Sequence, residues 1–246
     1  MLGVIQILLK EKHLKKKVSP QNAKSSKQTD KTRTVLNEAS NSVKAFLGAF
    51  DRSCRSRRNT GGMSTDEEQD LLRAMLVFAA AGLDSVLKRL IKDSILDLTK
   101  VDDKVRAKLE SFISNQLRTD STGTMSKGVA GFLAAILASP SAHTKLIELY
   151  IAYLTGTSLQ SADEISRTIS ALGLEPKPLN FEFALFKRIF EVRNAIIHEL
   201  DINLNSRYRR RNIRRRDEMR EYAEQLLRLA DAIVEAVDKK LKRATV

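Results

Sequence analysis

The sequence predicts an all-α protein, a helical bundle with extra short helices and a basic N-terminal extension. Apolar residues recur at three- and four-residue steps in every long segment, which is the spacing of a helix with one buried face. Only 10 glycines and 4 prolines occur in 246 residues, whereas an all-β fold needs many turns. We therefore expect a helical domain over residues 63–246, and an extension over residues 1–62 that is partly disordered or weakly helical.

The N-terminal extension carries most of the positive charge. The chain has a formal net charge of +13, and residues 1–62 hold 14 Lys and Arg against 4 Asp and Glu. We expect this extension to pack little against the bundle, because few of its apolar residues are periodic. Residues 18–34 are typical of a linker, residues 35–50 are predicted to be weakly helical, and residues 51–62 form a second polar break. If Met63 serves as an alternative start codon, residues 1–62 are an appendage to a fold that begins at Ser64.

The first long helix is predicted to be the central one. A capping box, Ser64-Thr-Asp-Glu67, opens it, and the segment from Ala74 to Leu83 is apolar on nearly all sides. Its buried face is expected to consist of Leu72, Met75, Leu76, Ala79, Leu83, Val86, Leu87 and Leu90. Shorter helices are predicted to follow at residues 101–117, 129–138, 143–154 and 163–172, with a break at residues 120–131 that lacks a P-loop motif.

Two further helices complete the predicted bundle. One runs from Asn180 to Asp201, because Pro176 and Pro178 forbid an earlier start and Asn180 is a suitable N-cap. The last helix covers residues 217–242 and carries apolar residues in register for packing. We expect these two helices to lie antiparallel to each other in the core.

An arginine lies inside the apolar stripe of the segment 180–201. Arg193 projects between Ile189 and Ile196, and burying an unpaired charge there is costly. Arg193 must therefore have a partner or reach a polar site. Asp84, at the margin of the apolar face of the central helix, is the candidate partner, with a surface ion pair between Asp84 and Lys88 as the alternative.

Arg193, Asn194 and His198 form the candidate catalytic group. Asn194 and His198 are four residues apart and share one edge of the helix. Arg193 and His198 lie about 140° apart around the axis and about 7.5 Å apart along it, so only a side chain as long as Arg brings its head group near the imidazole. His is suited to proton transfer near neutral pH, and Arg is suited to binding phosphate oxygens.

The pattern Arg193-Asn194-x-x-x-His198 resembles the R-x4-6-H signature of the HEPN superfamily (higher eukaryotes and prokaryotes nucleotide-binding domains). The resemblance covers residues 180–201, with helical context from roughly residue 65 to the end. Members of that superfamily are helical bundles, and many are metal-independent endoribonucleases. The resemblance implies a HEPN-like fold and a homodimer whose two Arg193/His198 edges line one cleft. It also implies a role in antiviral defence or as a toxin, with an antitoxin or sensor protein as a further partner.

A dense arginine cluster begins nine residues after His198. Seven of the ten residues in RYRRRNIRRR are Arg, and such a cluster is suited to RNA phosphates, while a tyrosine can stack on a base. The predicted RNA-binding residues are Arg207, Tyr208, Arg209, Arg210, Arg211, Arg214, Arg215 and Arg216. The alternative is a solvated basic loop that contributes only to solubility.

These observations predict a metal-independent endoribonuclease that leaves a 2′,3′-cyclic phosphate. No cofactor is expected, because the chain has only three His, a single cysteine (Cys54) and no paired acidic motif. The lone cysteine and the lack of a run of about 18–20 apolar residues predict a cytoplasmic protein without a membrane partner. Two alternatives remain, a non-catalytic helical nucleic-acid-binding protein that partners a separate enzyme, and an assembly subunit that docks another protein through its basic tail.

Overall fold

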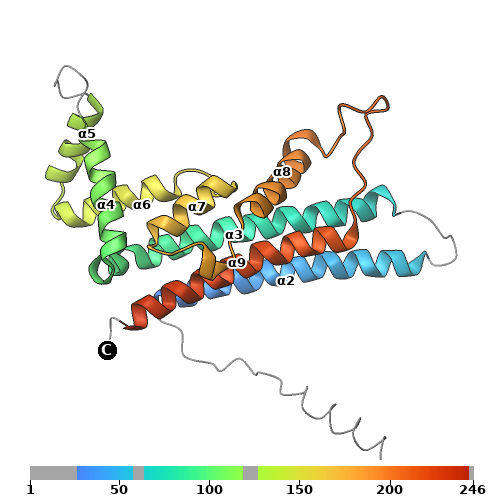
Figure 1. The fold of residues 1–246 in the computed structure, drawn as a ribbon, viewed down its shortest axis with the longest axis horizontal. Coiled ribbons are helices and arrows are strands. Elements are labelled where there is room, and N and C mark those ends of the chain that lie inside the picture. The colour runs from blue at the N-terminus through green and yellow to red at the C-terminus, as the bar shows by residue number, and fades with distance from the viewer. Residues whose placement is uncertain (1–26, 58–63, 119–126, 244–246) are drawn as a thin grey trace, which may run out of the picture.

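The computed structural model describes residues 27–57, 64–118 and 127–243 (Figure 1). In these ranges the chain forms 8 α-helices and a short 3-10 helix, with no β-strand, so the predicted all-α class is confirmed. The predicted helices are all present, with ends that differ by a few residues. Most of the predicted break at residues 120–131 lies outside the described ranges.

Three long helices form the body of the molecule (Figure 1): α2 (Lys27–Ser56), α3 (Asp66–Val101) and α9 (Arg216–Arg243). Helix α2 runs antiparallel to α9. Thr29, at the start of α2, hydrogen-bonds to Asp238 near the end of α9, and Arg216, at the start of α9, hydrogen-bonds to Asp51 near the end of α2. Helix α3 is central as predicted. Its eight predicted core residues, from Leu72 to Leu90, are all inaccessible to solvent.

The prediction that residues 1–62 pack little against the bundle is wrong for residues 27–56. Helix α2 occupies the end of the predicted linker and the start of the predicted polar break, and it lies along both α3 and α9. Leu36, Val43 and Phe50 recur every seven residues and are at most 6% exposed. This narrow apolar seam is sufficient for a helix that buries one edge, although the segment is polar on average. Residues 1–26 and 58–62 lie outside the described residues.

Helices α2 and α3 approach each other closely at Gly82. A Cβ atom built on Gly82 would lie only 2.5 Å from the Cβ atom of Ala39. Glycine at this position therefore permits the two backbones to pack at a distance that any larger residue would prevent. The contact fixes α2 onto the central helix.

Four shorter helices extend from one end of α3: α4 (Asp103–Gln116), α5 (Lys127–Leu137), α6 (Ala142–Thr155) and α7 (Ala162–Ala171). Side chains cap the N-termini of several helices, and Thr65 and Glu68 form such a capping box at α3. This capping box is one residue later than predicted. Asp102 caps α4, and Ser161 caps α7.

The segment predicted as a helix from Asn180 to Asp201 is a 3-10 turn, η1 (Lys177–Leu179), followed by α8 (Phe183–Glu199). Asn180 ends η1 with a φ of 52° and does not cap α8, whose N-cap is Glu182. The predicted antiparallel core pairing with α9 is also wrong. Helix α8 packs on α3 and α7, while the core neighbours of α9 are α2 and α3. Arg188 of α8 reaches the first turns of α9, where it forms an ion pair with Glu218 and lies over the ring of Tyr222.

Candidate functional site

Helix α8 carries the three predicted catalytic residues and is anchored by its apolar stripe. Phe186, Ile189 and Ile196 are at most 9% exposed, which confirms this part of the apolar stripe. Ile197 and Leu200 have the same spacing but are 38% and 64% exposed, so the expected buried face is wrong at the C-terminal end of the helix. Arg193 and Asn194 are half-buried on this helix, and His198 is exposed in its last turn. The packing of the stripe therefore sets which of these polar groups face solvent.

Arg193 has its partners inside the protein. Its Nη1 donates to Oδ1 of Asn194 at 2.8 Å, and its Nη2 donates to Oε1 of Gln160. The Nε atom of Arg193 is buried and has no hydrogen-bond partner among the described residues. Burial lowers the pKa of Arg193, and the negative charge of Asp84 partly offsets this effect.

Asp84 does not form the predicted direct pair with Arg193. The Oδ1 atom of Asp84 accepts a hydrogen bond from the backbone N–H of Leu159 at 2.7 Å and forms an ion pair with Lys88 at 3.1 Å. The alternative partner, Lys88, is thus confirmed. Gln160 takes the expected place of Asp84 at the guanidinium, and no pattern in the sequence indicated it, because it lies in a loop between two predicted helices.

The structure does not join Arg193 directly to His198. The hydrogen bonds of the Arg193 guanidinium go to Asn194 and Gln160, and the imidazole of His198 has no hydrogen-bond partner in the described part of the chain. Asn194 orients the guanidinium and not the imidazole. His198 is consequently free to meet a ligand from solvent.

The arginine cluster lies on a projecting loop, residues 200–215, which we call the basic hairpin (Figure 1). Its two arms meet at an isolated antiparallel bridge between Ile202 and Arg211. Leu200 and Asp201 both adopt positive φ angles, 51° and 59°, and so turn the chain sharply out of α8. His198 is therefore separated from the hairpin by a single residue.

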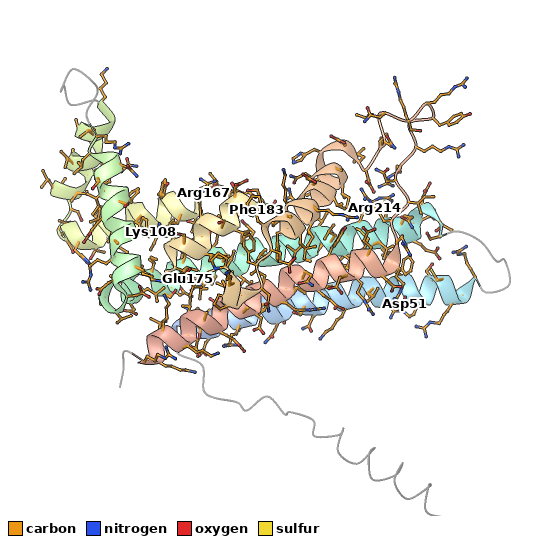
Figure 2. The ribbon with its side chains drawn as sticks, viewed as in Figure 1. Asp51, Lys108, Arg167, Glu175, Phe183 and Arg214 are labelled. Carbon is orange, nitrogen blue, oxygen red and sulfur yellow. The ribbon has the colours of Figure 1, made fainter. Side chains whose placement is uncertain are left out.

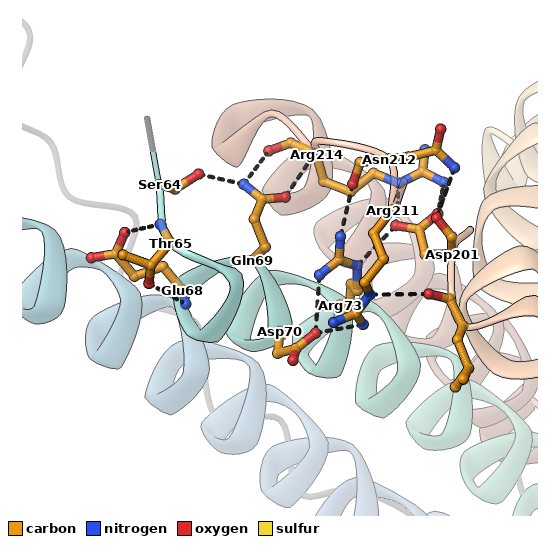
Figure 3. A network of polar contacts seen from close by, with 11 residues as sticks. Ser64, Thr65, Glu68, Gln69, Asp70, Arg73, Asp201, Arg211, Asn212 and Arg214 are labelled. Carbon is orange, nitrogen blue, oxygen red and sulfur yellow. Dashed lines mark hydrogen bonds and ion pairs between the residues drawn. The ribbon is translucent and has the colours of Figure 1, made fainter. Parts of the chain in front are cut away.

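Ion pairs at the base of the hairpin form the network in Figure 3. Asp201 is 0% exposed and accepts from Nε of Arg73 at 2.9 Å, from Nε of Arg214 at 3.0 Å and from Nδ2 of Asn212 at 3.1 Å. Burial alone raises the pKa of Asp201, but the hydrogen bonds from Arg214, Arg73 and Asn212 outweigh it, so the pKa lies below its ordinary value. Asp201 therefore stays ionised and ties the hairpin to α3.

Three of the predicted RNA-binding arginines form ion pairs with carboxylates of the protein itself. Arg211 pairs with Asp70 at 2.6 Å, and Arg214 pairs with Asp201. Arg216 binds Asp51 through two nitrogens, with Nε 2.7 Å from Oδ1 and Nη2 2.6 Å from Oδ2. Because each is bonded to a carboxylate, these arginines hold the hairpin and α2 in place before any ligand binds.

The other members of the cluster point into solvent. Arg207, Arg209, Arg210 and Arg215 are exposed and form no ion pair with the described residues. Tyr208 is 71% exposed, and the Arg210 guanidinium carbon lies 5.5 Å from the centre of its ring. Figure 2 shows nitrogen-tipped side chains spreading from the projecting end of the hairpin. Five of the eight predicted binding residues are thus exposed and form no ion pair with the described residues, namely Arg207, Tyr208, Arg209, Arg210 and Arg215.

Within the described residues no group of three or more His, Cys, Asp or Glu side chains is arranged to hold a metal ion. No helix in those ranges is long and apolar enough to cross a membrane. Comparison of the chain with protein-family models, curated proteins and solved structures finds no match. The resemblance to the HEPN superfamily therefore stays a hypothesis based on the spacing of Arg193 and His198.

Proposed function

We propose that this protein is a metal-independent endoribonuclease that holds RNA on the basic hairpin and cleaves it at His198. One observation carries the proposal. The exposed imidazole of His198 lies in the last turn of α8, and the hairpin with its exposed arginines begins two residues later. A phosphate backbone bound by Arg207, Arg209 or Arg210 then runs close to a side chain suited to proton transfer.

The proposed reaction uses the RNA 2′-hydroxyl as the nucleophile. A base removes the 2′ proton, the 2′-oxygen bonds to the adjacent phosphorus, and the bond from phosphorus to the 5′-oxygen breaks. An acid donates a proton to that 5′-oxygen, so the products are a 2′,3′-cyclic phosphate and a 5′-hydroxyl. His198 carries out proton transfer, and Arg193 stabilises the charge on the phosphorane.

To stabilise the phosphorane, Arg193 must release one of its present hydrogen-bond acceptors and bind a phosphate oxygen. Its present acceptors, the amide oxygens of Asn194 and Gln160, are neutral. A phosphate oxygen is charged and forms a stronger hydrogen bond with a guanidinium than an amide oxygen does. The Nε atom of Arg193 also lacks a hydrogen-bond partner among the described residues, but it is buried, so a phosphate reaches it only after the side chain moves.

A homodimer provides the second proton-transfer group, because one His does not readily act as base and acid together. Exposed apolar side chains surround the end of α8 and continue onto the hairpin: Ile197 at 38%, Leu200 at 64%, Leu204 at 62% and Ile213 at 62%. A two-fold interface over this surface brings two His198 side chains to one cleft. A monomer that keeps full activity at high dilution contradicts this assembly.

The decisive experiment incubates purified protein with RNA in EDTA, beside the His198→Ala and His143→Ala variants. His143 is the matched control, because it is another exposed histidine, on α6. We expect His198→Ala to lower cleavage by roughly 10²-fold or more, the usual scale for losing general acid–base catalysis, and His143→Ala to leave it unchanged. The products should carry cyclic phosphate ends, and DNA should remain intact.

Three results would overturn the mechanism. They are cleavage of DNA, activity that EDTA abolishes and Mg²⁺ restores, and full activity of the His198→Ala variant. If the wild type binds RNA but never cleaves it, the second candidate function holds, a non-catalytic nucleic-acid-binding protein that partners a separate enzyme. The internal hydrogen bonds of Arg193 favour this candidate, since they leave the guanidinium engaged.

The cellular role that we propose follows from the resemblance to the HEPN superfamily. It is antiviral defence or toxicity in the cytoplasm, where RNA is abundant, with an antitoxin or sensor protein as the restraining partner. Growth arrest on expression of the wild type, and normal growth with the His198→Ala variant, is the expected result. Equal growth with both proteins, at matched expression levels, counts against it.

A further inference from the structure

A cavity of about 340 Å³ opens between α4, α6 and α7. Lys108 and Arg167 lie at this cavity, in the opposite half of the molecule from Arg214 at the base of the basic hairpin (Figure 2). The volume is within the range of sites that hold small molecules, about 300–1,000 Å³. The cavity is thus separate from the proposed RNA site.

One wall of the cavity is aromatic. The ring centre of Phe112 lies 5.1 Å from that of Tyr150 and 4.9 Å from that of Tyr153, and all three residues line the cavity. Tyr153 is 58% exposed although it belongs to this cluster. An exposed aromatic ring beside an apolar wall offers a face on which a planar ring can stack.

Two of the lining residues carry hydroxyl groups and are almost wholly buried. Tyr150 is 1% exposed and Thr168 is 2% exposed. A hydroxyl group both donates and accepts hydrogen bonds, so these two residues offer polar contacts to a ligand in the cavity. Burial also raises the pKa of Tyr150 to about 12, which keeps its hydroxyl protonated and able to donate.

Two positively charged side chains line the cavity. Lys108 and Arg167 are exposed and form no ion pair among the described residues. The single carboxylate of the lining, Glu164, accepts hydrogen bonds from the backbone N–H of Gln160 and from Oγ of Ser161, both at 3.0 Å. It is therefore engaged in capping α7 and leaves the two cations available.

We propose that this cavity binds a small planar aromatic molecule that carries an anionic group, of which a nucleoside monophosphate is an example. The ring stacks against Tyr153 and Phe112. Tyr150 and Thr168 hydrogen-bond to its polar edge, and Lys108 and Arg167 bind the anionic group. This site does not depend on the proposed nuclease activity, because it shares no residue with it.

The test is isothermal titration calorimetry of the full chain with 5′-AMP and 5′-UMP. Adenosine and inorganic phosphate are the comparison ligands, since each presents only one of the two features. We expect saturable binding of a nucleotide and an affinity at least about tenfold lower for adenosine and for phosphate. This difference reflects the strength of a charge-assisted contact and of stacking.

Variants localise the binding. The double variant Lys108→Met/Arg167→Met should weaken it by about tenfold or more, and Tyr150→Phe, which removes only the hydroxyl, by about 2- to 10-fold. Lys92→Met is the matched control, because Lys92 is exposed on α3 and does not line the cavity. The Arg207→Ala/Arg209→Ala/Arg210→Ala variant controls for nucleotide bound by the hairpin. Neither control should change the affinity.

Three outcomes overturn the proposal: no saturable binding of either nucleotide at millimolar concentration, equal affinity for adenosine, or an affinity that the hairpin variant lowers and the Lys108/Arg167 variant does not. Circular dichroism and thermal melting of each variant confirm that the helices are intact. Both cations are exposed, so we expect their removal to leave the fold unchanged.

Discussion

Arg73 of α3 and Asp201 at the base of the basic hairpin form an ion pair almost closed to solvent. Nε of Arg73 lies 2.9 Å from Oδ2 of Asp201, and the two side chains are 4% and 0% exposed. Arg73 also donates from Nη2 to the backbone oxygen of Asn212 at 2.7 Å. The pair thus fastens both arms of the hairpin to the central helix, and it holds Asp201 in its left-handed conformation.

Asp201→Ala should destabilise the fold by about 3–5 kcal/mol, because it removes the buried carboxylate that Arg73 and Arg214 share. Asp70→Ala is the matched control. Asp70 binds the same arginine, but its side chain is 53% exposed, so we expect a loss of about 1 kcal/mol or less. Urea unfolding followed by circular dichroism measures both. Equal losses in the two variants would show that the buried pair is no more important than the exposed one.

The arginines of residues 207–216 should divide into two groups. Replacing Arg207, Arg209 and Arg210 by Ala should weaken RNA binding and flatten its dependence on salt, without lowering the melting temperature, because these side chains are exposed. Replacing Arg211, Arg214 and Arg216 should lower the melting temperature, because Asp70 and Asp201 then keep only Arg73 as an ion-pair partner and Asp51 loses its ion pair. Binding assays at several salt concentrations, with thermal melts of the same preparations, test this division. An exposed triple variant with unchanged affinity would remove the hairpin from the RNA site.

Gly82→Ala should destabilise the contact between α2 and α3 by about 1–3 kcal/mol, the usual cost of overpacking a core. The added Cβ meets the Cβ of Ala39 at 2.5 Å, so the helices must move apart. Ala39→Gly removes the opposing atom and should restore part of the stability in the double variant. A Gly82→Ala variant as stable as the wild type would disprove the close packing of α2 on the central helix.

The stability of the fold should fall in acid through Glu68. Hydrogen bonds from Arg57, opposed by burial, hold the pKa of Glu68 at about 2, below the ordinary value of 4.5. Since the folded pKa is depressed, the ionised carboxylate stabilises the fold above about pH 4.5, and the contribution is lost as the pH falls towards 2. The difference in melting temperature between the wild type and Glu68→Gln should therefore shrink between about pH 5 and pH 2. Glu110→Gln, at an exposed position without an ion pair in the described part of the chain, should show no such change.

Much of the secondary structure was predictable from local spacing alone. The central helix, the apolar stripe of α8 and the final helix follow from residues that repeat every three or four positions, because that period places them on one face of a helix. The place of Arg193 within the stripe, and of His198 at its exposed end, follow from the same geometry. The sequence predicted only a weak helix over residues 35–50 and missed the full extent and the packing of α2. The helix buries only a narrow seam at Leu36, Val43 and Phe50, and its buried Thr29 and Thr32 are indistinguishable from linker residues in the sequence.

The sequence by itself determined that this protein is helical, basic, and equipped with an Arg, an Asn and a His near one helix end. Only the tertiary structure decided which charges are free. Arg210 and Arg211 are neighbours of the same type, yet Arg211 is paired with Asp70 and Arg210 is exposed. Likewise, Arg193 has Gln160 as its partner, 33 residues away. The physical reason is that helix formation depends on neighbours along the chain, whereas the partner of a charged group depends on which distant segments the fold brings within a few ångströms.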